Sequence, residues 1–108
     1  MALKVLIAGA GMGGLAAASS LMKAGHDVEV YEQAPALGEV GAGIQMSANA
    51  MHVLLDLGMG EEIDCLSVRP GAYVFRAFDT GEEISRFNLA ADHEKLHGAP
   101  YCLSLIHI

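Results

Sequence analysis

Three glycines near the amino terminus are spaced so that a backbone turn could bind phosphate. The stretch IAGAGMGG contains Gly9, Gly11 and Gly14 in the pattern GxGxxG. In this pattern the first glycine permits a sharp turn, the second lets the backbone approach a pyrophosphate, and the third lets a helix pack closely on a strand. The first N–H groups of that helix would face the phosphates. The residues of the predicted turn are Gly9, Ala10, Gly11, Met12, Gly13 and Gly14.

An acidic residue follows where a ribose would need it. Glu32 ends a predicted strand, near the roughly 20-residue spacing at which a carboxylate accepts hydrogen bonds from a ribose diol. Ala18 and Gly25 extend the pattern to GxGxxGxxxAxxxxxxG, which keeps the helix close to the sheet. No lysine or arginine lies between Lys23 and Arg69 to receive a 2′-phosphate, so the sequence disfavours NADP at this turn. The alternative is an unrelated glycine turn with a solvated Glu32.

A second motif could in principle bind zinc. His93 and His97 belong to HEKLH, which matches the H-E-x-x-H signature of zinc proteases. However, Gly98 and Pro100 should end any helix within a few residues, and His107 is the only histidine that follows. We therefore predict a solvated polar segment here and no metal site.

The elements expected around the glycines form one unit. Leu3–Gly9 is short, apolar and almost uncharged, which is typical of a buried parallel strand. An alanine-rich helix is expected over Leu15–Gly25, and a second strand over His26–Glu32 with Val28 and Val30 on one face. A strand, tight turn, helix and strand within about 30 residues predict a βαβ unit.

The rest of the chain predicts a helix and a hairpin. Residues 33–46 read as a loop, residues 61–64 as a further helical turn, and residues 88–100 as polar and weakly patterned. Ser47–Gly58 is amphipathic, with a serine to cap its start and a glycine after its end. AYVFRAF and EEISRF, joined by Asp79–Gly81, predict a β-hairpin. The predicted fold class is α/β: a Rossmann-like βαβ dinucleotide-binding unit followed by a helix and a β-hairpin, truncated.

Composition narrows the class of protein. The chain has 108 residues, a net charge of −7 and 53% hydrophobic residues, which indicates one small domain or a piece of a larger one. Its six basic residues are scattered, so we expect no nucleic-acid partner. No apolar run reaches the roughly 18 residues of a membrane span. Cys65 and Cys102 match no metal spacing and are typical of a reduced, cytoplasmic protein.

Two stretches carry a family resemblance. IAGAGMGGLAAASSLMKAGHDVEVYEQAP and GEVGAGIQMSANAMHVLLDLG resemble the opening of the single-component flavin monooxygenases that hydroxylate aromatic rings, such as salicylate, hydroxybenzoate and 6-hydroxynicotinate hydroxylases. The resemblance covers residues 3 to about 101. It implies FAD as the cofactor, NADH or NADPH as a transient reductant, and a small aromatic substrate that receives one oxygen atom.

The resemblance also implies cofactor contacts. FAD would contact the glycine turn, with Glu32 on the adenosine ribose and Gln33 beside it. The loop of Gly41, Ala42, Gly43 and Ile44 would approach the flavin. Gln45 stands where some relatives have a histidine near the substrate, so the substrate stays open. The family's later Asp-Gly and Gly-Asp motifs are missing, so no catalytic residue is assigned, and we expect the 108 residues alone to be inactive.

The carboxyl-terminal residues suggest where the natural sequence stops. Leu103–Ile108 match one reading frame of the transposase end used in sequencing libraries, so we expect an apolar tail with no sheet to join. Residues 1–102 would be a partial FAD-binding domain, with the hairpin at about 72–87 as a candidate start of the substrate domain. The alternatives are a self-standing, non-catalytic module that binds FAD or NAD, and part of an NAD-dependent dehydrogenase.

Overall fold

The computed structural model describes residues 1–38 and 43–104 of the chain. The chain divides into two compact units, a first unit of Met1–Val40 and a second unit of Gly41–Ile108. Both contain helices and strands, which confirms the predicted α/β class.

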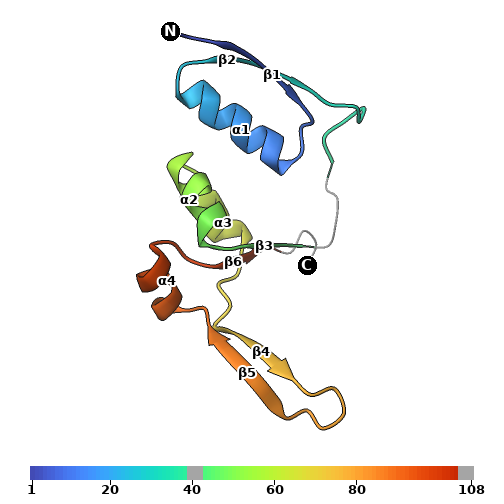
Figure 1. Ribbon diagram of the computed structural model, residues 1–108, viewed down its shortest axis with the longest axis vertical. Coiled ribbons are helices and arrows are strands. Elements are labelled where there is room, and N and C mark those ends of the chain that lie inside the picture. The colour runs from blue at the N-terminus through green and yellow to red at the C-terminus, as the bar shows by residue number, and fades with distance from the viewer. Residues whose placement is uncertain (39–42, 105–108) are drawn as a thin grey trace. The chain divides into compact units, whose positions relative to one another are not determined.

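The first unit is a βαβ arrangement. Strand β1 (Lys4–Ala8) leads through the glycines into helix α1 (Met12–Lys23), and strand β2 (Asp27–Tyr31) follows. The two strands pair in parallel, and α1 packs against both (Figure 1). Gly25, at φ +88°, follows the last turn of α1 in the left-handed region that glycine tolerates best. The predicted unit is therefore confirmed.

The prediction that the first strand is buried is wrong: three of the five residues of β1 are exposed and the other two are partly buried. Val5 and Ile7 are partly buried, whereas Leu6 is 61% exposed. The physical reason is that α1 packs on one side of a pair of strands. On β1 and β2, Lys4 and Glu29 form an exposed ion pair with 2.7 Å between Nζ and Oε1.

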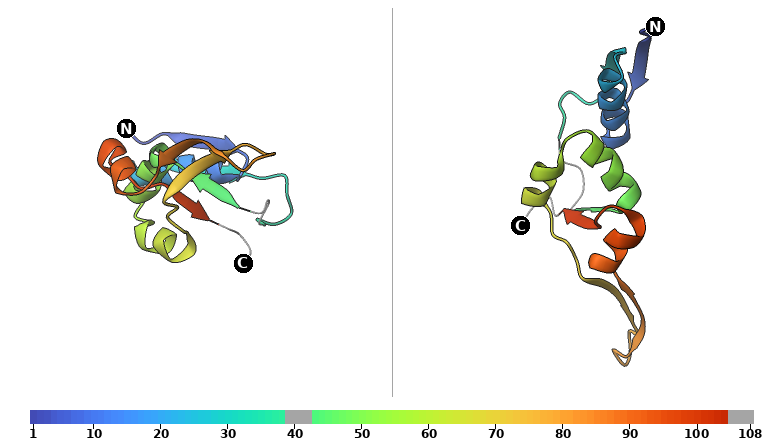
Figure 2. Two further views of the ribbon diagram at one scale, coloured as in Figure 1. Left: turned by 90° about the horizontal axis from the view of Figure 1, so that it is seen from below. Right: turned by 90° about the vertical axis from the view of Figure 1, so that its left-hand side faces the viewer.

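The second unit has more elements. In chain order they are β3 (Ile44–Met46), α2 (Ala48–Asp56), α3 (Gly60–Leu66), β4 (Ala72–Arg76), β5 (Glu83–Asn88), α4 (Ala91–His97) and β6 (Cys102–Ser104). Strand β3 pairs antiparallel with β6, and the left view of Figure 2 shows the two side by side. The core of this unit consists of Ala48, Met51, Ile63, Ala99 and Cys102. Its α2 and its following helix confirm the helices expected over 47–58 and 61–64.

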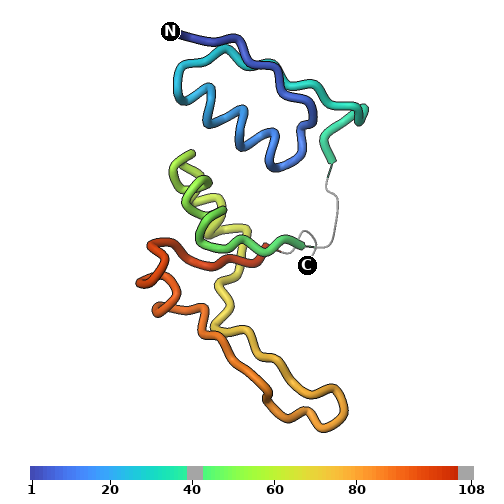
Figure 3. Tube along the Cα trace, viewed as in Figure 1, coloured from blue at the N-terminus to red at the C-terminus, as the bar shows by residue number. Residues whose placement is uncertain are grey.

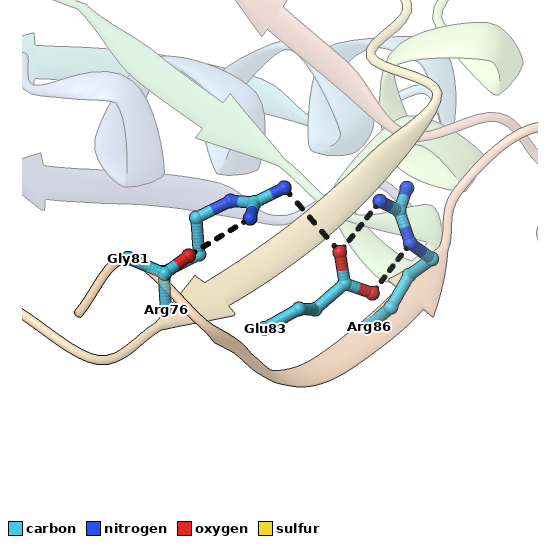
Figure 4. A network of polar contacts seen from close by, with 4 residues as sticks. All are labelled: Arg76, Gly81, Glu83 and Arg86. Carbon is cyan, nitrogen blue, oxygen red and sulfur yellow. Dashed lines mark hydrogen bonds and ion pairs between the residues drawn. The ribbon is translucent and has the colours of Figure 1, made fainter.

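The predicted hairpin is also confirmed. Strands β4 and β5 pair antiparallel, and Gly81 takes φ +71° in the connecting turn. Glu83 lies between two guanidinium groups (Figure 4): Arg86 donates bonds of 2.9 and 2.8 Å, and an Arg76 nitrogen lies 3.4 Å away. The bond from Arg86 lowers the pKa of Glu83, and the same bond raises the pKa of Arg86.

Polar side chains tie the hairpin to the short strands of the second unit. The Tyr101 hydroxyl donates to Gln45 Oε1 at 2.8 Å, and the Tyr73 hydroxyl contacts both Gln45 and Tyr101. Burial, followed by the bond with Tyr73, raises the pKa of Tyr101 to about 12. The hydroxyl of Tyr73, on strand β4 of the hairpin, is thereby linked to Gln45 on β3.

Two segments differ from the prediction. Residues 33–46 contain β3, and the polar segment 88–100 contains the seven-residue helix α4. Helix α4 has acidic residues in its first turn and basic ones in its last, which favours it electrostatically, and Gly98 at φ +74° ends it. Among the helices of the described residues, none is long and apolar enough to cross a membrane.

The end of the described chain also differs from expectation. Leu103 and Ser104 belong to β6 and lie opposite Gln45 and Ile44, so these two residues do join a sheet. Their pairing does not test where the natural sequence stops, which stays a prediction. Residues 105–108 lie outside the described residues.

Candidate nucleotide-binding site

Two glycines of the turn are required by the protein's own geometry. Gly9 has φ +106°, and its N–H donates to the Tyr31 carbonyl at 2.7 Å. A Cβ added at Gly14 would lie 1.9 Å from the Gly9 carbonyl oxygen, a distance that no side chain could tolerate. Figure 3 shows how tightly the chain turns from β1 into α1 at this point. Glycine is thus needed at one position for conformation and at the other for close packing.

The other two glycines face open space. A Cβ added at Gly11 or at Gly13 would meet no heavy atom within 4 Å. Gly11 precedes the first residue of α1, and no side chain caps that helix start in the described part of the chain. The first N–H groups of α1 are therefore not used by a side-chain cap, and they give the turn a partial positive charge. An anion could approach the backbone here.

Glu32 is bound to the backbone on both sides. Its Oε2 accepts a hydrogen bond from the Ala10 N–H at 2.7 Å, and its Oε1 accepts one from the Ala34 N–H at 2.8 Å. These bonds, first from Ala34 and then from Ala10, hold the pKa of the Glu32 carboxyl below its usual value of 4.5. The side chain is therefore a carboxylate at neutral pH, which suits a hydrogen-bond acceptor.

An open hollow lies at the end of the two strands. Its volume is about 530 Å³, within the range of small-molecule sites. The residues that line it are Ala8, Gly9, Tyr31, Glu32 and Gln33. Tyr31 also donates its hydroxyl to Glu29 at 2.8 Å, which raises the Tyr31 pKa. The hollow belongs entirely to the first unit.

The structure brings together only part of the predicted site. The glycine turn, Glu32 and Gln33 meet in the first unit. Gly41 and Ala42 lie outside the described residues, while Gly43 and Ile44 belong to the second unit, with Ile44 as the first residue of β3. Their contact with a flavin stays a prediction.

Sequence reasoning missed two backbone groups and one lining residue of this site. They are the Ala34 N–H that holds Glu32, the Tyr31 carbonyl that holds Gly9, and Tyr31 as a residue that lines the hollow. Every residue has a carbonyl and nearly all have an N–H, so the first two leave no signal. Tyr31 could have been found as the residue next to Glu32.

The HEKLH motif forms a short helix with its histidines on one side. The rings of His93 and His97 lie 4.5 Å apart between centroids, and His52 Nε2 lies 2.8 Å from the His97 carbonyl oxygen. Over residues 1–38 and 43–104, no group of three or more His, Cys, Asp or Glu side chains could hold a metal ion. The residues of α4 are mostly exposed, as predicted for a solvated segment, but they form a helix that the weak pattern did not predict.

Comparisons with solved and curated proteins agree with this geometry. The chain is 41% identical over 101 residues to a 3-hydroxybenzoate 6-hydroxylase of Polaromonas naphthalenivorans, covering 94% of the chain and 25% of that protein. It is 34% identical to a 6-hydroxynicotinate 3-monooxygenase of Bordetella bronchiseptica, covering 91% of the chain and 26% of the relative. The chain thus spans about a quarter of the length of these relatives.

A solved structure gives the same picture. The crystal structure of Klebsiella pneumoniae HpxO complexed with FAD and uric acid superposes with a TM-score of 0.77 at 32% identity, over 95% of this chain and 25% of that one. Residues 7–60, which are 54 of the 108, match a family described as the NAD(P)-binding Rossmann-like domain. That match contains the glycine turn, Glu32 and Gln33, and the protein belongs to the NAD(P)-binding Rossmann-like domain family.

Proposed function

We propose that this chain is the FAD-binding portion of an NAD(P)H-dependent flavoprotein monooxygenase that hydroxylates an aromatic ring. The observation that carries the proposal is the glycine turn beside an ionised Glu32, already formed around an open hollow. The names of the hydroxylase relatives support the reaction class and a small aromatic or heterocyclic substrate. The substrate itself and the oligomeric state are left open.

FAD and NAD share the part that this site would recognise. Both contain an ADP half, and the family's description mentions NAD(P) while the HpxO complex contains FAD. We favour FAD because that complex is 32% identical over nearly all of this chain. In the relatives' reaction class, NADH or NADPH would act as a transient reductant.

Each part of the site would hold a different part of the cofactor. The N–H groups at the start of α1 would bind the pyrophosphate, Glu32 would accept bonds from the adenosine ribose, and Gln33 would lie beside that ribose. The segment of Gly41, Ala42, Gly43 and Ile44 would contact the flavin ring. When bound, FAD supplies the redox chemistry. No residue of this chain is assigned a catalytic role, so the chain alone is proposed to bind and not to hydroxylate.

A cytoplasmic location belongs to the same proposal. Cys65 is exposed and Cys102 is buried, and both are free thiols. Unpaired cysteines are typical of a reducing compartment.

Ligand competition tests the function directly. We would measure binding of FAD, ADP, NAD, NADP and FMN to the full 108-residue chain by calorimetry. FAD and ADP should bind and compete, NADP should bind more weakly than NAD, and FMN, which lacks the ADP half, should not bind. Tight FMN binding, or failure of ADP to compete with FAD, would contradict the site. FAD no tighter than NAD would favour the alternative, a non-catalytic nucleotide-binding module.

A further inference from the structure

We propose that Glu32 is also a positioning residue, which holds the phosphate-binding turn in shape before any nucleotide arrives. This inference rests on the proposed nucleotide site and adds a second role at the same carboxylate. Its two oxygens connect the Ala10 N–H, inside the turn, with the Ala34 N–H, in the segment after β2. We call this pair of bonds the Glu32 clamp.

The clamp acts next to a second anchor. The Gly9 N–H is bound to the Tyr31 carbonyl at 2.7 Å, so two consecutive amides of the turn are held by the end of β2. Gly9 has a positive φ, and a glycine can adopt several other backbone conformations of similar energy. Gly11 has open space around it and is not held by packing. Loss of the Ala10 anchor would let this glycine-rich turn sample other conformations. Nucleotide binding would then have to restore its order.

The clamp leaves room for the ribose. An ionised carboxylate has about four acceptor positions, two on each oxygen. The bonds from Ala10 and Ala34 use one on each oxygen. The Gln33 N–H also acts on this carboxylate and lowers its pKa, so at least one acceptor position remains for a hydroxyl of a ribose diol. The ribose would therefore join the clamp and would not have to displace it.

Glutamine cannot reproduce this arrangement. Its amide has nearly the size of the carboxylate but offers a single acceptor oxygen, and its NH₂ group only donates. In Glu32→Gln one of the two backbone N–H groups would face another donor. The substitution therefore breaks the clamp with little change in volume.

Charge and clamp make opposite predictions for a ligand without ribose. By charge alone, removing a carboxylate beside a phosphate site should strengthen binding of inorganic pyrophosphate. If the clamp orders the turn, the same substitution should weaken that binding. A role limited to the ribose would leave pyrophosphate binding no weaker than in the wild type. The direction of the change thus separates the clamp from the other two roles.

Amide hydrogen exchange tests the clamp without any nucleotide. In the ¹⁵N-labelled full chain, Glu32→Ala and Glu32→Gln should speed exchange at Ala10 and Ala34 about tenfold, as expected for loss of a bond to a charged acceptor. The matched control is Glu29→Gln in β2, three residues before Glu32, whose carboxylate binds Lys4 and Tyr31 and not the turn. It should leave both amides unchanged. Unchanged exchange in Glu32→Ala would overturn the clamp.

Two further measurements complete the test. Pyrophosphate should bind Glu32→Gln about threefold more weakly, and tighter binding would overturn the inference. In the wild-type chain, which cannot suffer from misfolding of a variant, the amide protons of Ala10 and Ala34 should shift together as acid protonates one carboxyl. Independent titrations would contradict a shared clamp. Because exchange and titration need no ligand, they can succeed even where FAD fails to bind.

Discussion

The two units of this chain are held together in different ways. Among residues 1–38 of the first unit, Ala18 is the one buried residue, and the turn is fixed by backbone bonds and by close contact of Gly14 with Gly9. In the second unit Met51 and Cys102 are fully buried among apolar neighbours. A site that presents its backbone to a ligand needs glycines and hydrogen bonds that hold the turn. A unit held by packing needs large buried side chains.

The largest effect should come from the packed unit. Met51→Ala should lower its free energy of unfolding by about 4 kcal/mol, because a methionine that is 1% exposed would leave a cavity. The control on the same helix is Val53→Ala, 43% exposed, which should cost less than about 1 kcal/mol. Urea unfolding followed by amide exchange in α2 measures both. Equal costs would mean that buried side chains do not hold the second unit, which would remove its contrast with the first.

The next largest loss of stability should come from the first unit, whose turn is fixed by backbone contacts. Gly14→Ala would force a Cβ against the Gly9 carbonyl and should destabilise β1 and β2 by about 2–3 kcal/mol. Gly13→Ala, one residue earlier in α1 and in open space, should instead stabilise the helix by up to about 1 kcal/mol. Exchange rates of the β1 and β2 amides report both values. If the two variants behave alike, close contact at Gly14 is not what holds the turn.

Nucleotide affinity should change by a smaller amount. Glu32→Ala should weaken FAD binding about tenfold, since it removes a charged hydrogen-bond acceptor from both ribose and turn. Glu29→Ala, in β2 three residues earlier and bound to Lys4, should leave affinity within about twofold. Calorimetric titration compares the three chains. Unchanged FAD affinity in the first variant would remove Glu32 from the site.

Salt should reveal the smallest difference. Glu32 and Glu83 both have a pKa below 4.5, so each stabilises its unit above about pH 4.5 and loses that contribution as pH falls through its folded pKa. Arg86 lowers the pKa of Glu83 through an exposed ion pair, whereas backbone N–H groups lower that of Glu32. Adding about 0.5 M NaCl should therefore raise the pKa of Glu83 more than that of Glu32. NMR titration of the two carboxyl groups measures both pKa values with and without salt. Equal changes would mean that salt screens the interactions of Glu32 as much as those of Glu83.

Local patterns predicted the elements that depend on neighbours in sequence. The βαβ unit, α2 and the hairpin all carry periodicity, glycines or turn residues within a short window. Strands β3 and β6 have three residues each and exist because they pair with each other across more than fifty positions. Such a pairing depends on tertiary structure and leaves too little local pattern to be seen.

In the candidate site too, some residues could be predicted from the sequence and their partners could not. Gly9, Gly14 and Glu32 could be predicted because their roles depend directly on residue type, which the sequence shows. The partners of Glu32 could not, since the Ala10 and Ala34 contributions are main-chain N–H groups. Whether Leu6 is covered was also beyond prediction, because exposure depends on what packs over the strand.

The double attachment of Glu32 bears on any attempt to change which dinucleotide is accepted. Redesign for a 2′-phosphate would begin by removing this acidic side chain and adding a cation nearby. Here that exchange would also release Ala10 and Ala34 from their common acceptor. A redesigned chain would need a new acceptor for these amides together with the new cation, so selectivity and loop order would have to be engineered as one trait.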